Sequence, residues 1–90
     1  MKLQNYLSRV EQIDQLIRTY STGQPADLAD KVGISESMLY NYLQFMRRSG
    51  APIEYSRLQK TYFYRYQGKF SFSFETFEQE LKQHLGMSGQ

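Results

Sequence analysis

The sequence predicts a mainly α-helical fold with a small β-sheet, and two observations lead to this class. Up to about residue 48, apolar residues recur every three or four positions, which is the period of helices with one buried face. After Pro52, β-branched and aromatic residues dominate, as they do in strands. A chain of 90 residues forms one modest hydrophobic core, so both parts are expected to belong to a single domain.

The first helix is expected over roughly residues 3–20, a length of about five turns. A single apolar stripe marks it: Leu3, Tyr6, Leu7, Val10, Ile13, Leu16, Ile17 and Tyr20. The segment "STGQP" follows. Its glycine, Gly23, is expected to end this helix, and its proline, Pro25, suits the first turn of the next one.

Two shorter helices are expected to follow. Residues 25–32 form the second helix, with Leu28, Ala29 and Val32 facing inward, and Gly33 ends it. Ser35 is an N-cap residue for the third helix, which runs to about residue 48. The apolar face of this third helix is expected to comprise Met38, Leu39, Tyr42, Leu43 and Met46.

The remaining elements are predicted from strand-like patterns and a last apolar stripe. "IEYS" and "TYFYRY" flank the polar segment "RLQK", which indicates a β-hairpin over residues 53–66. In "KFSFSF" phenylalanine alternates with serine, which predicts a further strand with one buried face. Phe77, Leu81 and Leu85 are spaced four apart and predict a short C-terminal helix.

The segment "LADKVGIS" has the spacing of a helix-turn-helix motif. Ala29 allows two helices to approach closely, Gly33 tolerates a positive φ in the turn, and Ile34 anchors that turn to the core. Leu39 and Tyr42 are expected to hold the third helix across the second. A small helical bundle could contain the same pattern, but the aromatic hairpin disfavours that alternative. Three helices followed by a hairpin predict a winged helix-turn-helix fold for residues 1–66, with residues 67–90 as a C-terminal extension of the same domain.

Residues 8–66 resemble the N-terminal winged helix-turn-helix domain of DeoR-like and WYL-domain bacterial transcription regulators. "LADKVGIS", "MLYNYLQFMRRSGAPIEYSR" and "TYFYRY" carry the resemblance. It implies a small bacterial regulator that binds double-stranded DNA sequence-specifically, with residues 35–48 as recognition helix and residues 53–66 as wing. Because the chain ends soon after the wing, we expect neither the effector domain of larger relatives nor a small-molecule effector.

The resemblance also implies which side chains contact DNA. The base-reading face comprises Ser35, Glu36, Ser37, Tyr40, Asn41 and Gln44. The phosphate contacts come from Arg47 and Arg48 at the helix end and from Arg57 and Lys60 on the wing. In the major groove, asparagine and glutamine side chains can each bind adenine through two hydrogen bonds.

The predicted reading face is polar but not basic, although relatives often carry Arg or Lys at positions 36, 37 and 41. Glu36 either accepts a hydrogen bond from a cytosine amino group or complements the dipole of its own helix. Positive charge concentrates instead in residues 50–74, whose net charge is +3. We therefore expect weak binding by one copy and a homodimer that reads two half-sites. Its interface is expected in the N-terminal helix or in the C-terminal segment with Phe77, Leu81 and Leu85. The alternative role of these apolar residues is to cover the aromatic sheet.

Other functions are less well supported by the sequence. The alternative to DNA reading is a winged helix that mediates protein-protein interaction or oligomerisation. The tyrosines at 62, 64 and 66 could stack on single-stranded bases, but such alternation more often closes a core. No enzyme motif, metal site or cofactor site is evident, and the chain has no cysteine. With neither a signal peptide nor a membrane-spanning run, a cytoplasmic location is expected.

Overall fold

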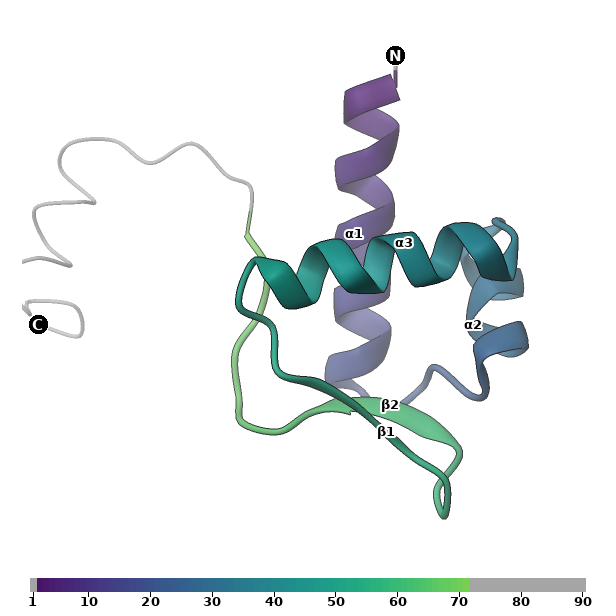
Figure 1. The fold of residues 1–90 in the computed structure, drawn as a ribbon, viewed down its shortest axis with the longest axis vertical. Coiled ribbons are helices and arrows are strands. Elements are labelled where there is room, and N and C mark those ends of the chain that lie inside the picture. Colours follow the sequence, from purple (N-terminus) through teal and green to yellow (C-terminus); the bar gives the residue numbers. More distant parts are fainter. Residues whose placement is uncertain (1, 72–90) are drawn as a thin grey trace, which may run out of the picture.

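The computed structural model describes residues 2–71, which form three helices followed by one β-hairpin (Figure 1). The elements in chain order are α1 (Lys2–Arg18), α2 (Pro25–Val32), α3 (Glu36–Arg48), β1 (Ile53–Ser56) and β2 (Thr61–Tyr64). The two strands pair antiparallel in a two-stranded sheet. The predicted class, mainly helical with a small β-sheet, and the order of these five elements are confirmed.

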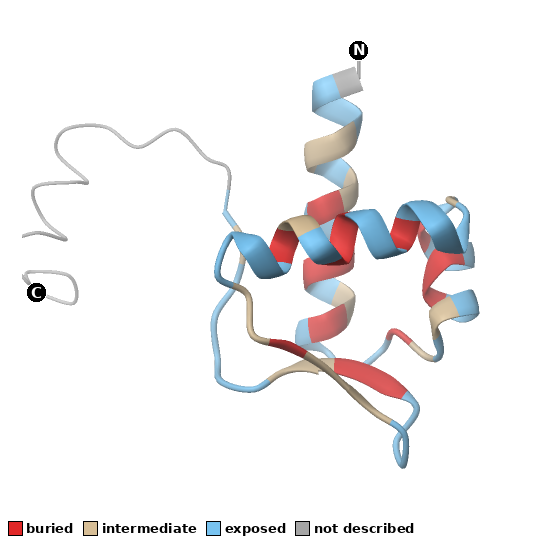
Figure 2. Cartoon of the chain, viewed as in Figure 1, coloured by how far each residue is buried: buried red, intermediate tan, exposed pale blue. Residues whose placement is uncertain are grey.

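The hydrophobic core lies where α1, α2, α3 and the hairpin meet. In Figure 1, α1 crosses behind α3, and the hairpin runs below α3. The buried positions of all five elements face this common space (Figure 2). They comprise Val10, Ile13, Ile17, Leu28, Ala29, Val32, Leu39, Tyr42, Leu43, Met46, Ile53 and Tyr62. Complete burial of one such aliphatic side chain contributes about 1.5–3 kcal/mol, so this shared core fixes the position of α3 against the hairpin.

The first helix ends earlier than its sequence predicts. It stops at Arg18 because Tyr20 adopts the left-handed conformation, with φ of 55°. The N–H of Ser21 donates to the carbonyl of Leu16 at 2.9 Å, which closes the helix end before Gly23 is reached along the chain. Gly23 therefore does not end α1. Tyr20 is 62% exposed, so its assignment to the buried stripe is wrong.

The turn between α2 and α3 follows the predicted pattern. Gly33 has φ of 81°, and its N–H donates to the carbonyl of Ala29 at 2.8 Å. A side chain other than glycine is strained at this φ, which explains the choice of residue. Ser35 caps α3, since its hydroxyl oxygen accepts a hydrogen bond from the N–H of Met38 at 3.1 Å.

The apolar face of α3 differs from the predicted one at two positions. Met38 is 42% exposed, so its assignment to the buried face is wrong. Phe45 instead packs against the core from the α1 side, where its ring meets that of Tyr6 edge-on at 5.5 Å between centroids. Tyr42 is buried as expected, but its ring lies 4.5 Å from that of Tyr6. Tyr42 thus joins α3 to α1, a contact that the local pattern did not predict.

The hairpin is shorter than predicted and is fixed at one edge. β2 ends at Tyr64, so residues 65–66 are outside the strand. The loop between α1 and α2 lies beside β2. A side chain of this loop forms hydrogen bonds with β2 where a sheet would have a third strand. The buried Thr22 hydroxyl accepts from the N–H of Tyr62 at 2.8 Å and lies 3.0 Å from the hydroxyl of Thr61.

The segment after the hairpin differs from its prediction. A strand was expected to begin near Lys69, but residues 67–71 form no strand. The N–H of Phe70 donates instead to a carboxylate oxygen of Asp14 in α1 at 3.2 Å, so it does not pair with a sheet edge. The rest of that expected strand and the predicted helix with Phe77, Leu81 and Leu85 lie outside the described residues.

Candidate nucleic-acid interface

The exposed face of α3 carries a row of polar side chains. Successive residues of an α-helix are about 100° apart, so positions 37, 41, 44 and 48 lie opposite the buried face. The alternation of buried and exposed positions along α3 is visible in Figure 2. The row comprises Ser37, Asn41, Gln44 and Arg48, all exposed. Its residues offer hydrogen-bond donors and acceptors at the surface, with a single cation near the C-terminal end of the helix.

All ten residues that the sequence predicts to contact DNA are exposed. Six lie at the start of α3 or along it: Ser35, Glu36, Ser37, Tyr40, Asn41 and Gln44. The other four are Arg47 and Arg48 at its end and Arg57 and Lys60 in the turn of the hairpin. Exposure meets the first requirement for direct contact, while the contacts themselves stay predictions.

A second row on α3 faces the hairpin. Burial raises the pKa of Tyr62 in β2, and the neighbouring Tyr40 raises it further, whereas the positive charge of Arg47 lowers it. The negative charge of Glu36 also raises the pKa of this hydroxyl. Residues 36, 40 and 47 share one side of α3, so the groups that act on the hydroxyl of Tyr62 come from this side of the helix. The ring of Tyr62 also lies 4.9 Å from that of Tyr55, so tyrosines line the junction of α3 and the hairpin.

Arg47 has a structural contact that sequence reasoning missed. Its Nε donates to the main-chain carbonyl of Ile53 at 3.3 Å. This contact ties the C-terminal end of α3 to the first residue of β1. Arg47 therefore fixes the angle between helix and hairpin, and only its remaining guanidinium donors are free to serve the predicted phosphate contact.

The charge on the hairpin is concentrated in its turn. Glu54 pairs with Arg65 across the hairpin at 2.5 Å, so these two charges offset one another. Within residues 2–71, the structure shows neither an ion pair nor a side-chain hydrogen bond for Arg57 or Lys60. Between these two cations lies Leu58, which is 92% exposed. Leu58 is a functional candidate that the sequence pattern does not reveal, although it is the one apolar residue in the polar segment "RLQK".

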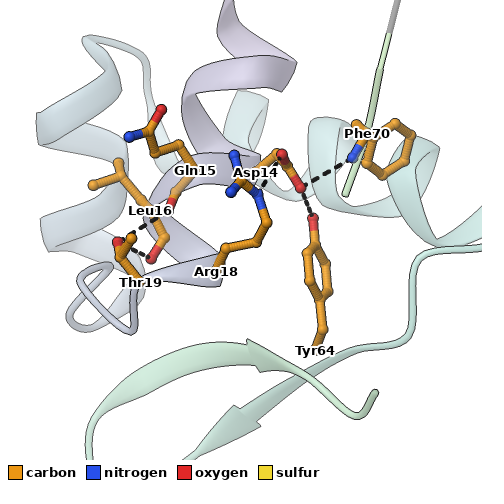
Figure 3. Close-up of polar contacts among 7 residues, drawn as sticks. All are labelled: Asp14, Gln15, Leu16, Arg18, Thr19, Tyr64 and Phe70. Atoms are coloured by element: carbon orange, nitrogen blue, oxygen red, sulfur yellow. Dashed lines mark hydrogen bonds and ion pairs between the residues drawn. The ribbon is translucent and has the colours of Figure 1, made fainter. Parts of the chain in front are cut away.

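A buried carboxylate fixes the hairpin to α1 (Figure 3). Asp14 is only 2% exposed, and its Oδ2 accepts from Nε of Arg18 at 2.9 Å. Its Oδ1 accepts from the hydroxyl of Tyr64 at 2.6 Å and from the N–H of Phe70 at 3.2 Å. One side chain thus joins α1, β2 and the segment after the hairpin. Sequence reasoning missed it because its partners in β2 and beyond are far away along the chain.

The same network changes the acidity of Tyr64. Burial is the main cause that raises the pKa of its hydroxyl far above the ordinary value, and the hydrogen bond to Asp14 is the next. The positive charge of Arg18 acts in the opposite direction. Burial also raises the pKa of Tyr62 and the pKa of Tyr6. A tyrosine hydroxyl is protonated at neutral pH in any case, and the raised pKa keeps Tyr64 a hydrogen-bond donor to Asp14 into the alkaline range.

The raised pKa of Tyr64 predicts that the protein loses stability in alkali. Its contribution is complete below the unfolded pKa of about 10 and is lost as the pH rises from there through the folded value. In that window the free energy of unfolding is expected to fall by about 1.4 kcal/mol per pH unit for this group. Tyr64→Phe is expected to show a shallower fall, measured by urea denaturation at a series of alkaline pH values. Tyr66→Phe, at a 63% exposed position, is the matched control, and equal slopes for Tyr64→Phe and wild type would contradict the assignment.

The tyrosines of the hairpin serve mainly as packing residues. Tyr62 is 4% exposed, and Tyr64 is half-buried with its hydroxyl bound to Asp14. Only Tyr66, beyond the end of β2, is largely exposed. The interpretation that these rings close the core is therefore confirmed for Tyr62 and Tyr64, and a stacking platform for single-stranded bases is not formed by them.

Two other kinds of functional feature are absent from residues 2–71. Within that range no cluster of three or more His, Cys, Asp and Glu side chains is placed to hold a metal ion. Over the same residues no helix combines the length and apolar character needed to cross a bilayer.

Comparison with known proteins adds no relative. No protein-family model matches the chain, and no curated protein or solved structure is significantly similar to it.

Proposed function

We propose that this chain is a winged helix-turn-helix domain that binds double-stranded DNA, with α3 as recognition helix and the β1–β2 hairpin as wing. The observation that carries the proposal is the exposed polar row of α3 beside a hairpin whose turn holds two cations, Arg57 and Lys60, with no ion-pair partner among residues 2–71. Helix and hairpin are held together by the core and by the contact of Arg47 with Ile53. Such a unit can present base-reading groups and phosphate-binding charges to one duplex.

The side chains of α3 favour A·T base pairs. Asn41 and Gln44 have the amide groups that bind adenine through its N6 and N7 atoms. Met38 and Tyr40 are 42% and 49% exposed, and their apolar atoms can contact thymine methyl groups. No arginine or lysine, the usual partners of guanine, occurs in α3 before Arg47. Glu36 in the first turn is the one group suited to a cytosine amino group.

Few phosphate contacts are available to one copy. Arg48, Arg57 and Lys60 are the exposed cations of this surface, and Arg47 is partly engaged elsewhere. Each phosphate contact contributes about −0.9 to the slope of log affinity against log salt concentration, so one copy is expected to have a slope near −3. A homodimer that reads two half-sites doubles this and is part of the proposal. A small bacterial transcription regulator acting in the cytoplasm is the role that fits such binding.

The salt dependence of DNA binding tests the proposal. The double variant Arg57→Ala/Lys60→Ala is expected to make the slope shallower by about 2 per copy and to weaken binding to all sequences alike. The measurement is fluorescence anisotropy of labelled duplex over a series of salt concentrations. Glu54→Gln/Arg65→Gln removes one acid and one base from the same hairpin, and its slope is expected to equal that of wild type.

Two results would contradict DNA reading. One is the absence of duplex binding at low salt, and the other is selection from a random duplex library that enriches no sequence motif. If the salt slope changes for Glu54→Gln/Arg65→Gln but not for Arg57→Ala/Lys60→Ala, the phosphate contacts of the wing do not come from Arg57 and Lys60. Each outcome can be read without knowledge of the natural target sequence.

A second candidate function is protein-protein interaction through the same face. The observation that favours it is the exposure of Met38 and Tyr40 on a helix face that lacks basic residues before Arg47. In that case Met38→Ser/Tyr40→Ser would abolish self-association measured by sedimentation, and association would persist in high salt. DNA reading predicts the opposite response to salt, so one titration separates the two candidates.

A further inference from the structure

The turn of the hairpin presents one apolar side chain at its tip. Leu58 is more exposed than any other large hydrophobic residue of the described chain, at 92%. Figure 1 shows this turn protruding beyond the helices, at the end of the molecule away from the N-terminus of α1. A single exposed leucine is unremarkable by itself. Its position between Arg57 and Lys60 on a protruding turn is the feature that requires an explanation.

The tip is held in a defined conformation. The N–H of Gln59 donates to the hydroxyl oxygen of Ser56 at 3.0 Å, and Lys60 adopts a left-handed φ of 56°. The last strand pair, Ser56 with Thr61, closes the ladder directly below the turn. Thr61 is in turn held by the buried Thr22. Leu58 is therefore presented at a fixed place relative to the hairpin and its core, as a wedge must be.

We propose that Leu58 is a wedge that enters the DNA minor groove and inserts between two base pairs, so that binding kinks the duplex. This inference rests on the proposed DNA-binding function and deepens it. Apolar side chains of this kind partly unstack a base step in the minor groove and bend the duplex by about 20–90° toward the major groove. Arg57 and Lys60 on either side of the wedge can neutralise the phosphates that border the opened step.

The chemistry of the tip favours insertion over other uses. A leucine offers no hydrogen bond to a base edge or phosphate, so what it gains on insertion is the removal of its apolar surface from water. A protein partner is disfavoured because one leucine between two cations is far smaller than the roughly 800 Å² that each side of a stable interface buries. The flexible TA step is the easiest to open, and it agrees with the A·T preference inferred for Asn41 and Gln44.

The experiment measures base unstacking and duplex bending directly. The probes are A·T-rich duplexes of about 25 base pairs, each with one TA step that carries 2-aminopurine and with a donor and an acceptor dye at the ends. Wild-type protein at low salt is expected to raise the 2-aminopurine fluorescence and to shorten the end-to-end distance. Leu58→Ser is expected to abolish both changes while the salt slope is retained, and Leu58→Phe to preserve them.

The outcomes distinguish this inference from the function on which it rests. If wild type binds with a salt-dependent affinity but neither unstacks nor bends any probe, the wedge is wrong and DNA binding stands. The wedge is also wrong if Leu58→Ser bends the duplex as wild type does. If wild type binds no duplex, both proposals fail. Because Leu58 makes almost no contact within the domain, circular dichroism of Leu58→Ser is expected to match wild type.

Discussion

Replacing Asp14 with alanine is expected to lower the free energy of unfolding by about 3 kcal/mol. The substitution removes a buried carboxylate that accepts from Arg18, Tyr64 and Phe70. The part-buried hydroxyl of Tyr64 and N–H of Phe70 lose this acceptor, and a donor left unsatisfied away from water costs up to about 1–3 kcal/mol. The ion pair with Arg18 contributes less, because that side chain is 37% exposed to solvent. Domains of this size are stable by only about 5–15 kcal/mol, so the loss is large.

Urea denaturation followed by circular dichroism measures this effect. Asp30→Ala is the matched control, since Asp30 is an exposed acid on α2 and its loss is expected to change stability by less than about 0.5 kcal/mol. Asp14→Asn keeps one acceptor oxygen and is expected to fall between wild type and Asp14→Ala. A loss of less than about 1 kcal/mol for Asp14→Ala would show that the three contacts do not act as a buried network.

The parts of the fold that depend on local rules were predictable from the sequence. Helical periodicity identified α1, α2 and α3, and local rules placed the turn at Gly33 and the cap at Ser35. β-branched and aromatic composition identified the hairpin. Each of these signals acts over a few residues, so one sequence is enough to reveal it.

The errors have tertiary causes. A glycine is the usual residue at a helix end, which pointed to Gly23, but Tyr20 takes the left-handed conformation. Met38 and Phe45 lie on the same flank of α3, and the contact of Phe45 with Tyr6 of α1 buries one of them and not the other. No local pattern states how α1 approaches α3, so this choice could not be made from the sequence.

The candidate site was predictable in its exposure but not in its attachments. Helical period sufficed to place Asn41 and Gln44 on the outer face of α3. The contact of Arg47 with Ile53 and the fixation of β2 by Asp14 join elements that are separate along the chain. Leu58 could not be identified from the sequence, because one apolar residue in a turn is ordinary and only the structure shows that this turn protrudes beyond the helices.

The double variant Asn41→Ala/Gln44→Ala is expected to lose most of the sequence discrimination of the domain. Each amide that pairs with adenine contributes about 1–3 kcal/mol against the wrong base, so the two together account for about 2–6 kcal/mol. Neither residue is charged, and both lie on the exposed face of α3. The variant should therefore fold normally and keep the salt slope of wild type. The measurement is the affinity ratio between the selected duplex and duplexes with single A·T pairs replaced by G·C.

Gln15→Ala provides the control, because Gln15 is an exposed glutamine on α1 and its removal should leave the affinity ratio unchanged. If Asn41→Ala/Gln44→Ala discriminates as well as wild type, α3 does not read bases, even where the duplex is still bound. Loss of discrimination without a change in salt slope would show that base selection and phosphate attraction come from different residues of the surface. Asn41 and Gln44 would then select the sequence, while Arg57 and Lys60 supply attraction that is independent of it. Such a division would explain how the proposed recognition helix can be specific with so few basic residues, because the cations proposed to attract DNA lie on the hairpin beside it.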